Sequence, residues 1–208
     1  MYFWEEGELN RKQEGAILET GSVFLSACPG SGKTRTLTYK IAYELSKLKS
    51  KKSIVIAITY TNRAADEIHE RIEALGIDVS QLWIGTIHAF CLEWILKPYG
   101  IYHENLKHGF RVIDSHEREN ILDFLCENYK YITHWNCDFY ITETGYILGC
   151  QDEWKHNDIN IILSRYFEIL TENRELDFEL ILYYAFILID EQPSISLILS
   201  KIFSFVLI

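Results

Sequence analysis

Residues 27–34 read A-C-P-G-S-G-K-T and could bind the phosphates of a nucleotide. Gly30 and Gly32 would let the backbone curve around an anion, because they carry no Cβ atom. The amides of such a loop, together with the start of the next helix, would direct partial positive charge at the phosphates. Lys33 would reach the β- and γ-phosphates, and the hydroxyl of Thr34 would ligate Mg²⁺. The run therefore predicts a nucleoside triphosphate and Mg²⁺ as cofactors.

The segments on either side of this loop favour the same interpretation. Apolar residues 23–25 predict a buried strand before it, and Leu37, Ile41 and Leu45 recur at nearly helical spacing after it. A strand, a glycine-rich turn and a helix, in this order, are the context that a phosphate-binding loop requires. The alternative is a glycine-rich turn before an unrelated helix. One position departs from the strict phosphate-loop pattern, because this chain has Ala27 where the pattern has glycine.

An acidic pair could complete the nucleotide site. Asp190 and Glu191 follow apolar residues 185–189, which predict a buried strand. Phosphoryl transfer needs a carboxylate that holds Mg²⁺ and a group that orients the attacking water. If this strand ends beside the phosphate loop, Asp190 would bind the metal and Glu191 would act as general base. Together with Lys33 they are the predicted catalytic residues. A solvated strand end is the alternative interpretation.

The predicted elements that position these residues alternate along the chain. Strands are expected at residues 54–60 and 82–86, with helices from Asn62 and over residues 88–97. Unbroken apolar strands between helices indicate a buried parallel sheet in an α/β fold. We therefore expect a sheet domain from residues 1–99 and 181–208. Residues 100–180, whose apolar spacing is more helical than alternating, are expected to form a mostly helical insertion domain.

Composition narrows the class of protein. The chain has 208 residues, a net charge of −10 and 48% hydrophobic residues, which excludes a disordered protein and a uniformly basic nucleic-acid coat. A local binding groove remains compatible with this charge. The five cysteines form no C-x-x-C pair and indicate neither a zinc site nor a disulfide framework. No apolar run reaches the ~20 residues that span a bilayer, so we expect no membrane partner and a cytoplasmic location.

These motifs, in this order, resemble the superfamily 1 DNA helicases of the UvrD, Rep and PcrA type. Residues 9–13 are similar to the family's Q motif, and the G-K-T-R run at residues 32–35 matches as well. Residues 58–65, I-T-Y-T-N-R-A-A, are similar to the segment T-F-T-N-K-A-A. Residues 85–90, G-T-I-H-A-F, resemble the G-T-F-H motif. The agreement in order and spacing is more specific than any of these motifs alone.

The resemblance implies a RecA-like P-loop NTPase fold, ATP as the nucleotide and single-stranded DNA as a partner. In the family the glutamine of the Q motif holds the adenine edge, and the arginine of G-K-T-R packs near the base and ribose. The implied nucleotide-binding residues are Gln13, Pro29, Gly30, Ser31, Gly32, Lys33, Thr34 and Arg35. The implied DNA-binding residues are Thr59, Tyr60, Thr61, Asn62, Arg63, Thr86 and His88.

Elementary chemistry supports the DNA contacts but leaves an alternative. Tyr60 and His88 offer flat rings on which bases could stack. Threonine and asparagine offer neutral donors to phosphate, and Arg63 adds charge. However, threonine and asparagine after a strand also cap helices, and Tyr60 could instead pack inside the protein.

Two departures limit what the resemblance implies. The family's acidic motif reads D-E-Y/F-Q-D, whereas residues 190–194 read D-E-Q-P-S. Family members are several times longer and carry a second RecA-like domain that supplies arginines to the transition state. We therefore expect the ATP-binding domain of a helicase that couples ATP hydrolysis to translocation on DNA, truncated or split and weak or inactive alone. A second RecA-like domain or a partner protein would cover its apolar C-terminus. The alternative is a non-catalytic nucleotide- and DNA-binding subunit of a larger assembly, such as an antiphage defence complex.

Overall fold

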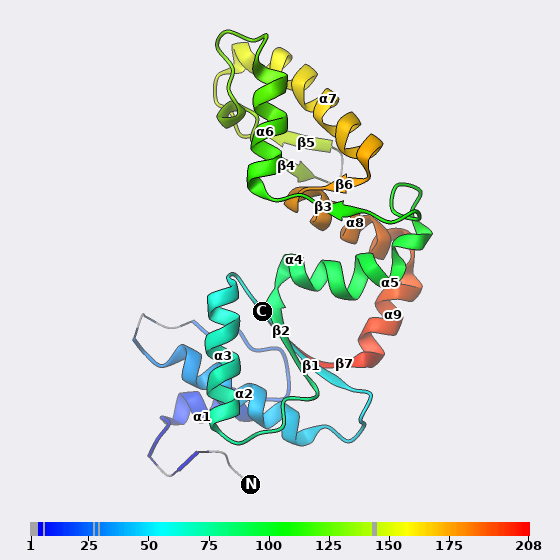
Figure 1. Ribbon diagram of the computed structural model, residues 1–208. Coiled ribbons are helices and arrows are strands. Elements are labelled where there is room, and N and C mark those ends of the chain that lie inside the picture. Colours follow the sequence, from blue (N-terminus) through cyan, green and yellow to red (C-terminus); the bar gives the residue numbers. More distant parts are fainter. Residues whose placement is uncertain (1–3, 6, 27, 29, 143–144) are drawn as a thin grey trace. The chain divides into compact units, whose positions relative to one another are not determined.

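The chain folds into two units. A computed structural model describes residues 4–5, 7–26, 28, 30–142 and 145–208 (Figure 1). The first unit comprises Met1–Phe90 and Ser196–Ile208, and the second comprises Cys91–Ile195. The first unit is therefore shorter, at both internal boundaries, than the sheet domain that we expected from residues 1–99 and 181–208.

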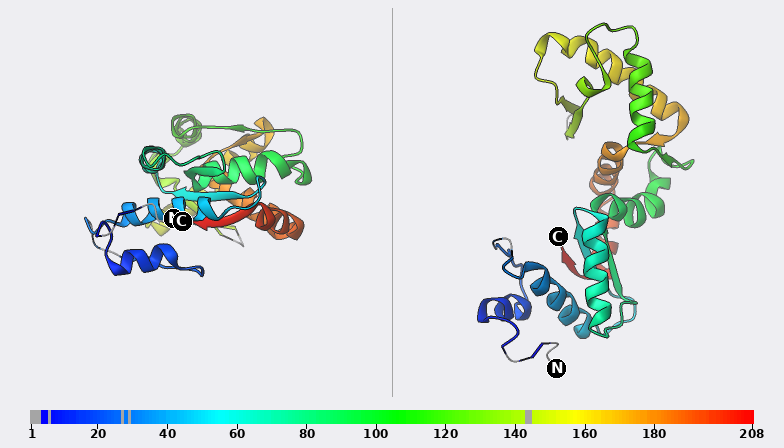
Figure 2. Two further views of the ribbon diagram at one scale, coloured as in Figure 1. Left: turned by 90° about the horizontal axis from the view of Figure 1, so that it is seen from below. Right: turned by 60° about the vertical axis from the view of Figure 1, so that its left-hand side comes forward.

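A three-stranded parallel sheet forms the centre of the first unit. Its strands are β1 (Ile54–Thr59), β2 (Leu82–Thr86) and β7 (Phe203–Leu207), in the order β2-β1-β7. They lie side by side in the views of Figures 1 and 2. The central strand β1 is buried on both faces, as its run of β-branched and small apolar residues requires. The predicted α/β class with a parallel sheet is confirmed.

Two helices, α2 (Lys33–Lys47) and α3 (Asn62–Ala74), build the main core of this unit on one face of the sheet. Ile41 and Leu45 of α2 pack with Ile68 and Ile72 of α3. Val55, Ala57 and Leu207 complete this core from the strands. Towards the other face, Phe90 at the end of α4 (Ile87–Phe90) contacts Trp83 and Phe203, with ring centroids 5.8 and 5.7 Å away. A shorter helix, α1 (Arg11–Leu18), packs on α2 and buries Ile17.

The second unit is mostly helical. It begins with the π-helical η1 (Cys91–Leu96), α5 (Lys97–Tyr99) and η2 (Gly100–Tyr102), and its longer helices are α6 (Ser115–Cys126), α7 (His156–Asn173) and α8 (Phe178–Glu191). Short strands β3 (Arg111–Val112) and β6 (Glu175–Leu176) pair in parallel, while β4 (Phe139–Thr142) and β5 (Gly145–Leu148) form a hairpin. Two 3-10 turns, η3 (His134–Asn136) and η4 (Glu153–Lys155), and helix α9 (Pro193–Ile202), which crosses the boundary between the units, complete the described elements.

The strand predicted at residues 185–189 is wrong, because these residues lie inside helix α8. Asp177 begins that helix: its side chain accepts a hydrogen bond from the amide of Leu180 at 2.9 Å. Ile181, Ala185 and Leu188 then recur at helical spacing and are buried. The strand that pairs with β1 is instead β7, farther along the chain.

The strand predicted at residues 23–25 is also absent, since residues 22–26 have no regular secondary structure. Phe24 is 93% exposed and Val23 is 46% exposed. Together with residues of β7 and α2 they line a cavity of about 700 Å³. They form no β-ladder of backbone hydrogen bonds with β7. An apolar run forms a strand only where a neighbouring strand accepts its hydrogen bonds.

Among the residues that the structure describes, no single helix is both long and apolar enough to cross a membrane. The helices α8 and α9 reach the required length and composition only as a pair, and that pair is bent by 100°.

Candidate functional site: a phosphate loop beside two strand ends

The phosphate loop ends in a sharp turn that leads directly into α2. Gly30 and Gly32 have φ values of +78° and +86°, which favour glycine. The amide of Ser31 donates to the carbonyl of Cys28 at 3.2 Å, and Lys33 is the first residue of the helix. The described part of the loop therefore presents the open amino end of a 15-residue helix with a lysine at its first position. Ala27 and Pro29 lie outside the described residues.

Gln13 connects the first helix to this loop. Asn10 caps α1, and the Gln13 side-chain oxygen accepts a hydrogen bond from the Asn10 amide at 2.9 Å. The Gln13 side-chain nitrogen donates to the carbonyl of Ser31 at 3.2 Å. A Cβ atom on Gly32 would lie only 2.8 Å from that nitrogen, so a larger residue there would displace the end of the Gln13 side chain. The structure thus brings together the Q-motif glutamine and the phosphate loop, which lie 18 residues apart.

Thr34 and Arg35 occupy the first turn of α2. Thr34 is half-buried and Arg35 is exposed. The positive charge of Arg35 also contributes, as the smallest of several causes, to a lowered pKa of Glu8. The largest cause is the hydrogen bond that Glu8 accepts from the hydroxyl of Tyr39. Burial and this hydrogen bond raise the pKa of Tyr39 to about 12. Side chains on the same face of α2 are therefore tied to the segment that leads into α1.

The two segments predicted to contact DNA meet at one edge of the sheet. Thr59 ends β1 and Thr86 ends β2, and the two residues are paired across the parallel ladder. The carboxyl ends of parallel strands are where α/β folds bind ligands. Tyr60 directly follows Thr59 and is 97% exposed, so the alternative that it packs inside the protein is wrong. His88 lies in α4 and is half-buried, which lowers the pKa of its imidazole.

The threonines at this edge also have the capping roles that the alternative interpretation proposed. The Thr61 hydroxyl accepts from the amide of Ala64 at 3.2 Å and begins α3. The Thr86 hydroxyl accepts from the amide of Ala89 at 3.3 Å. A threonine hydroxyl that accepts a capping hydrogen bond still carries one proton. The capping role therefore leaves the hydroxyl able to donate a hydrogen bond to a phosphate. Asn62 and Arg63 are the first two residues of α3 and are exposed.

Asp190 and Glu191 do not end a strand, so the reason for assigning them to Mg²⁺ was wrong. They are the exposed last two residues of α8. They belong to the second unit, whereas Lys33 and Thr34 belong to the first. Within the described residues no group of three or more histidine, cysteine, aspartate or glutamate side chains could hold a metal ion. The described loop fits a nucleotide phosphate, and Thr34 is the Mg²⁺ candidate that adjoins the loop in sequence, in the first turn of α2.

Sequence reasoning missed a buried ion pair on the helix that follows this loop. Lys40 lies on α2 only seven positions after Lys33, is 6% exposed, and forms an ion pair with Glu44 at 2.9 Å. The signal available in the sequence was a lysine next to Ile41 on the apolar side of an amphipathic helix. Such a residue needs partners when it is buried.

Comparison with known proteins agrees with the motifs. The family model described as the UvrD/REP helicase N-terminal domain matches residues 9–208. The chain is 36% identical over 126 residues to the ATP-dependent DNA helicase SRS2 of Saccharomyces cerevisiae, and 34% identical over 116 residues to the ATP-dependent DNA helicase PcrA of Bacillus subtilis. These matches cover 58% and 55% of this chain but 11% and 15% of the two relatives. The PcrA of Staphylococcus aureus (strain Mu50) is 32% identical over 122 residues, which are 58% of this chain and 16% of the relative.

Proposed function

Because the chain belongs to the UvrD/REP helicase N-terminal domain family, we propose that it binds ATP at the phosphate loop and single-stranded DNA at the strand ends. The observation that carries this proposal is the geometry of residues 30–33. Two glycines with left-handed backbone lead into the amino end of α2, and Lys33 stands at its first position. That arrangement places the first amides of a helix, the positive end of its dipole and the Lys33 side chain at one site that suits an anion.

Gln13 supports adenine as the base of the nucleotide. Its carboxamide uses one N–H on Ser31 and one lone pair on the Asn10 amide. One N–H and one lone pair remain available on the same group. A glutamine carboxamide pairs in this way with the N6 and N7 atoms of adenine. The relatives SRS2 and PcrA are named as ATP-dependent DNA helicases, which agrees with this choice of base.

The DNA-binding part of the proposal rests on exposure and position. Tyr60, Asn62 and Arg63 are exposed at the carboxyl end of β1, with Thr86 and His88 at the end of β2. An aromatic ring, neutral donors and one cation at a sheet edge suit a single strand, whose bases stack and whose phosphates accept hydrogen bonds. We assign no step of hydrolysis to Asp190 or Glu191.

The nucleotide site is tested by substituting Lys33. Calorimetry with ATP and Mg²⁺ should detect binding to the unaltered chain, and Lys33→Ala should weaken it about ten- to a hundredfold, because a charge-assisted hydrogen bond is lost. Lys51→Ala is the matched control, since Lys51 is an exposed lysine in the turn before β1. Equal ATP affinity in the unaltered chain and the Lys33→Ala variant would remove the phosphate-loop interpretation.

A further inference from the structure

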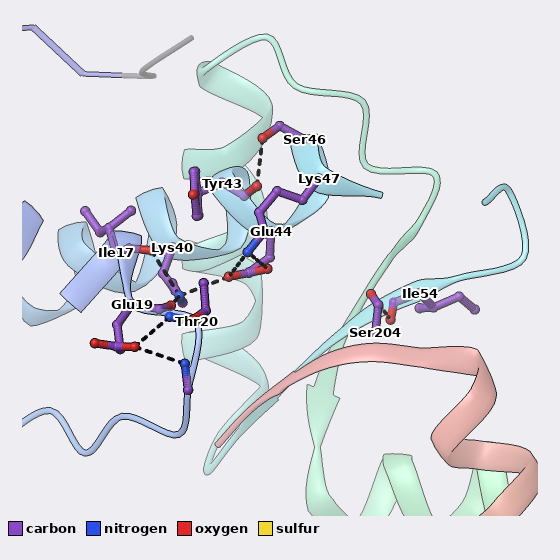
Figure 3. Close-up of polar contacts among 11 residues, drawn as sticks. Ile17, Glu19, Thr20, Lys40, Tyr43, Glu44, Ser46, Lys47, Ile54 and Ser204 are labelled. Atoms are coloured by element: carbon purple, nitrogen blue, oxygen red, sulfur yellow. Dashed lines mark hydrogen bonds and ion pairs between the residues drawn. The ribbon is translucent and has the colours of Figure 1, made fainter. Parts of the chain in front are cut away.

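Lys40 is a buried cation whose hydrogen-bonding capacity is used in full. Its ammonium donates to the carbonyl of Ile17 at 3.0 Å and to the carbonyl of Glu19, and pairs with the carboxylate of Glu44 at 2.9 Å (Figure 3). A lysine ammonium has three donors, so these three acceptors satisfy it. Figure 3 shows that the acceptors come from two segments, the end of α1 and the next turn of α2.

The two carbonyls belong to the end of α1, where the helix has no basic residue of its own. The last carbonyls of an α-helix have no partner inside the helix, and the negative end of its dipole favours a positive charge. Helix α1 has no basic residue in its last turn, and its C-cap Glu19 is extended. With eight residues, α1 is too short to be stable alone. Lys40 therefore supplies from α2 the cap and charge that α1 lacks.

The same short helix carries Gln13 at its other end. Gln13 holds the Ser31 carbonyl of the phosphate loop at 3.2 Å, and Lys40 holds the Ile17 carbonyl one turn farther along α1. Helix α1 is thus attached at one end to the loop before α2 and at the other end to the middle of α2. A change at Lys40 would remove the polar attachment at the carboxyl end of α1 and leave the apolar packing of Ile17 to hold it. The position of Gln13 on the same helix would then be less tightly fixed.

We propose that Lys40 is a positioning residue that sets the base selectivity of the nucleotide site through α1 and Gln13. This inference rests on the proposed binding of ATP at the phosphate loop. Lys40 touches neither base nor phosphate in this role. It fixes the direction in which Gln13 presents its remaining N–H and its remaining lone pair. Adenine offers one acceptor, N7, and one donor, N6, which match this N–H and lone pair. Guanine offers two acceptors, N7 and O6, at the same edge and does not match them.

The surroundings of Lys40 suggest how to remove its charge while the chain still folds. Glu44 is 9% exposed and also pairs with Lys47 at 3.1 Å, and the Lys40 ammonium lies 5.2 Å from the centre of the Phe205 ring. Removing one member of a buried pair leaves the other charge unpaired, whereas replacing both by apolar residues of similar size is often neutral. The double variant Lys40→Met, Glu44→Leu is therefore the main test, and Lys40→Arg is the conservative variant that keeps the charge.

The readout is the ratio of ATP affinity to GTP affinity, measured by calorimetry in the presence of Mg²⁺. In the double variant the preference for ATP should fall about three- to tenfold, because one or two hydrogen bonds to the base are misplaced. GTP affinity should stay within about twofold, because the phosphate loop is intact. Lys40→Arg should keep the preference. Lys51→Met, which removes an exposed lysine outside the network, is the matched control.

Each result has one meaning. A preference for ATP that survives in the double variant overturns the role of Lys40, and so does an equal loss for ATP and GTP, which general destabilisation would cause. An unaltered chain that binds both nucleotides equally also overturns it, since no base selectivity then exists. An unaltered chain that binds neither nucleotide refutes the proposed function itself.

Discussion

At the scale of single residues, Tyr60 is an almost fully exposed member of the proposed DNA-binding set. Tyr60 is 97% exposed, so packing among the described residues does not account for an aromatic residue at the end of β1. Stacking of a base on such a ring is worth ~1–3 kcal/mol. We expect the double variant Tyr60→Ala, His88→Ala to bind a labelled single-stranded oligonucleotide more weakly by about this amount for each stacked base. Fluorescence anisotropy at several salt concentrations measures the effect.

A matched control for this prediction is Tyr102→Ala, which removes a 64% exposed tyrosine from the second unit. It should leave DNA affinity unchanged. Because Arg63 and the helix ends would contact phosphates, binding by the unaltered chain should fall as salt rises. If the double variant and the unaltered chain bind equally well, the DNA surface does not lie at these strand ends.

At the scale of elements, the carboxyl end of α8 carries two negative charges where a helix dipole favours positive ones. Replacing them in the double variant Asp190→Asn, Glu191→Gln should therefore slightly raise the midpoint of thermal unfolding. It should also leave the affinity for ATP with Mg²⁺ within about twofold of the unaltered chain, because a helix rather than a strand holds these residues. Calorimetry and thermal unfolding followed by circular dichroism test both parts.

The opposite outcome of this experiment is informative. A loss of Mg²⁺-dependent ATP binding, with no loss in the absence of the metal, would restore the metal-binding role that the sequence suggested for Asp190. Thr34→Val is a useful comparison, since it removes the hydroxyl proposed to ligate Mg²⁺ at the start of α2 and keeps the side-chain shape.

At the scale of the whole molecule, the sheet of the first unit depends on a strand from the far end of the sequence. β7 pairs with β1, and the Ser204 hydroxyl donates to the Ile54 carbonyl 150 residues earlier (Figure 3). Leu207 is buried in the core with α2 and α3. Leu207→Ala should lower the free energy of unfolding of this unit by about 2–5 kcal/mol, because it leaves a cavity.

Hydrogen exchange can locate that loss. Amides of β1 and α2 should exchange faster in the Leu207→Ala variant, because Leu207 packs with residues of both elements. Amides of α7 should not change, because α7 belongs to the other compact unit. Val206→Ala is the control in the same strand, since Val206 is 45% exposed and its loss should cost less than about 1 kcal/mol. Equal acceleration in both units would mean that they unfold as one.

The sequence by itself determined the local elements whose signals lie within a few residues. The turn at Gly30 and Gly32, the strands β1 and β2, and the cap at Thr61 all follow from residue types and spacing, and the structure confirms them. The family followed from the order of the motifs, and the match over residues 9–208 confirms it.

Only the tertiary structure decided which apolar run joins the sheet. Residues 185–189 form a continuous apolar run, and Phe203–Leu207 is apolar apart from Ser204. Such short runs do not distinguish a buried helix from a buried strand. A strand exists where a neighbour accepts its hydrogen bonds, and β1 provides that neighbour to β7 and not to α8. The burial of Lys40 was likewise undetermined, because its acceptors on α1 come from a segment more than 20 residues earlier.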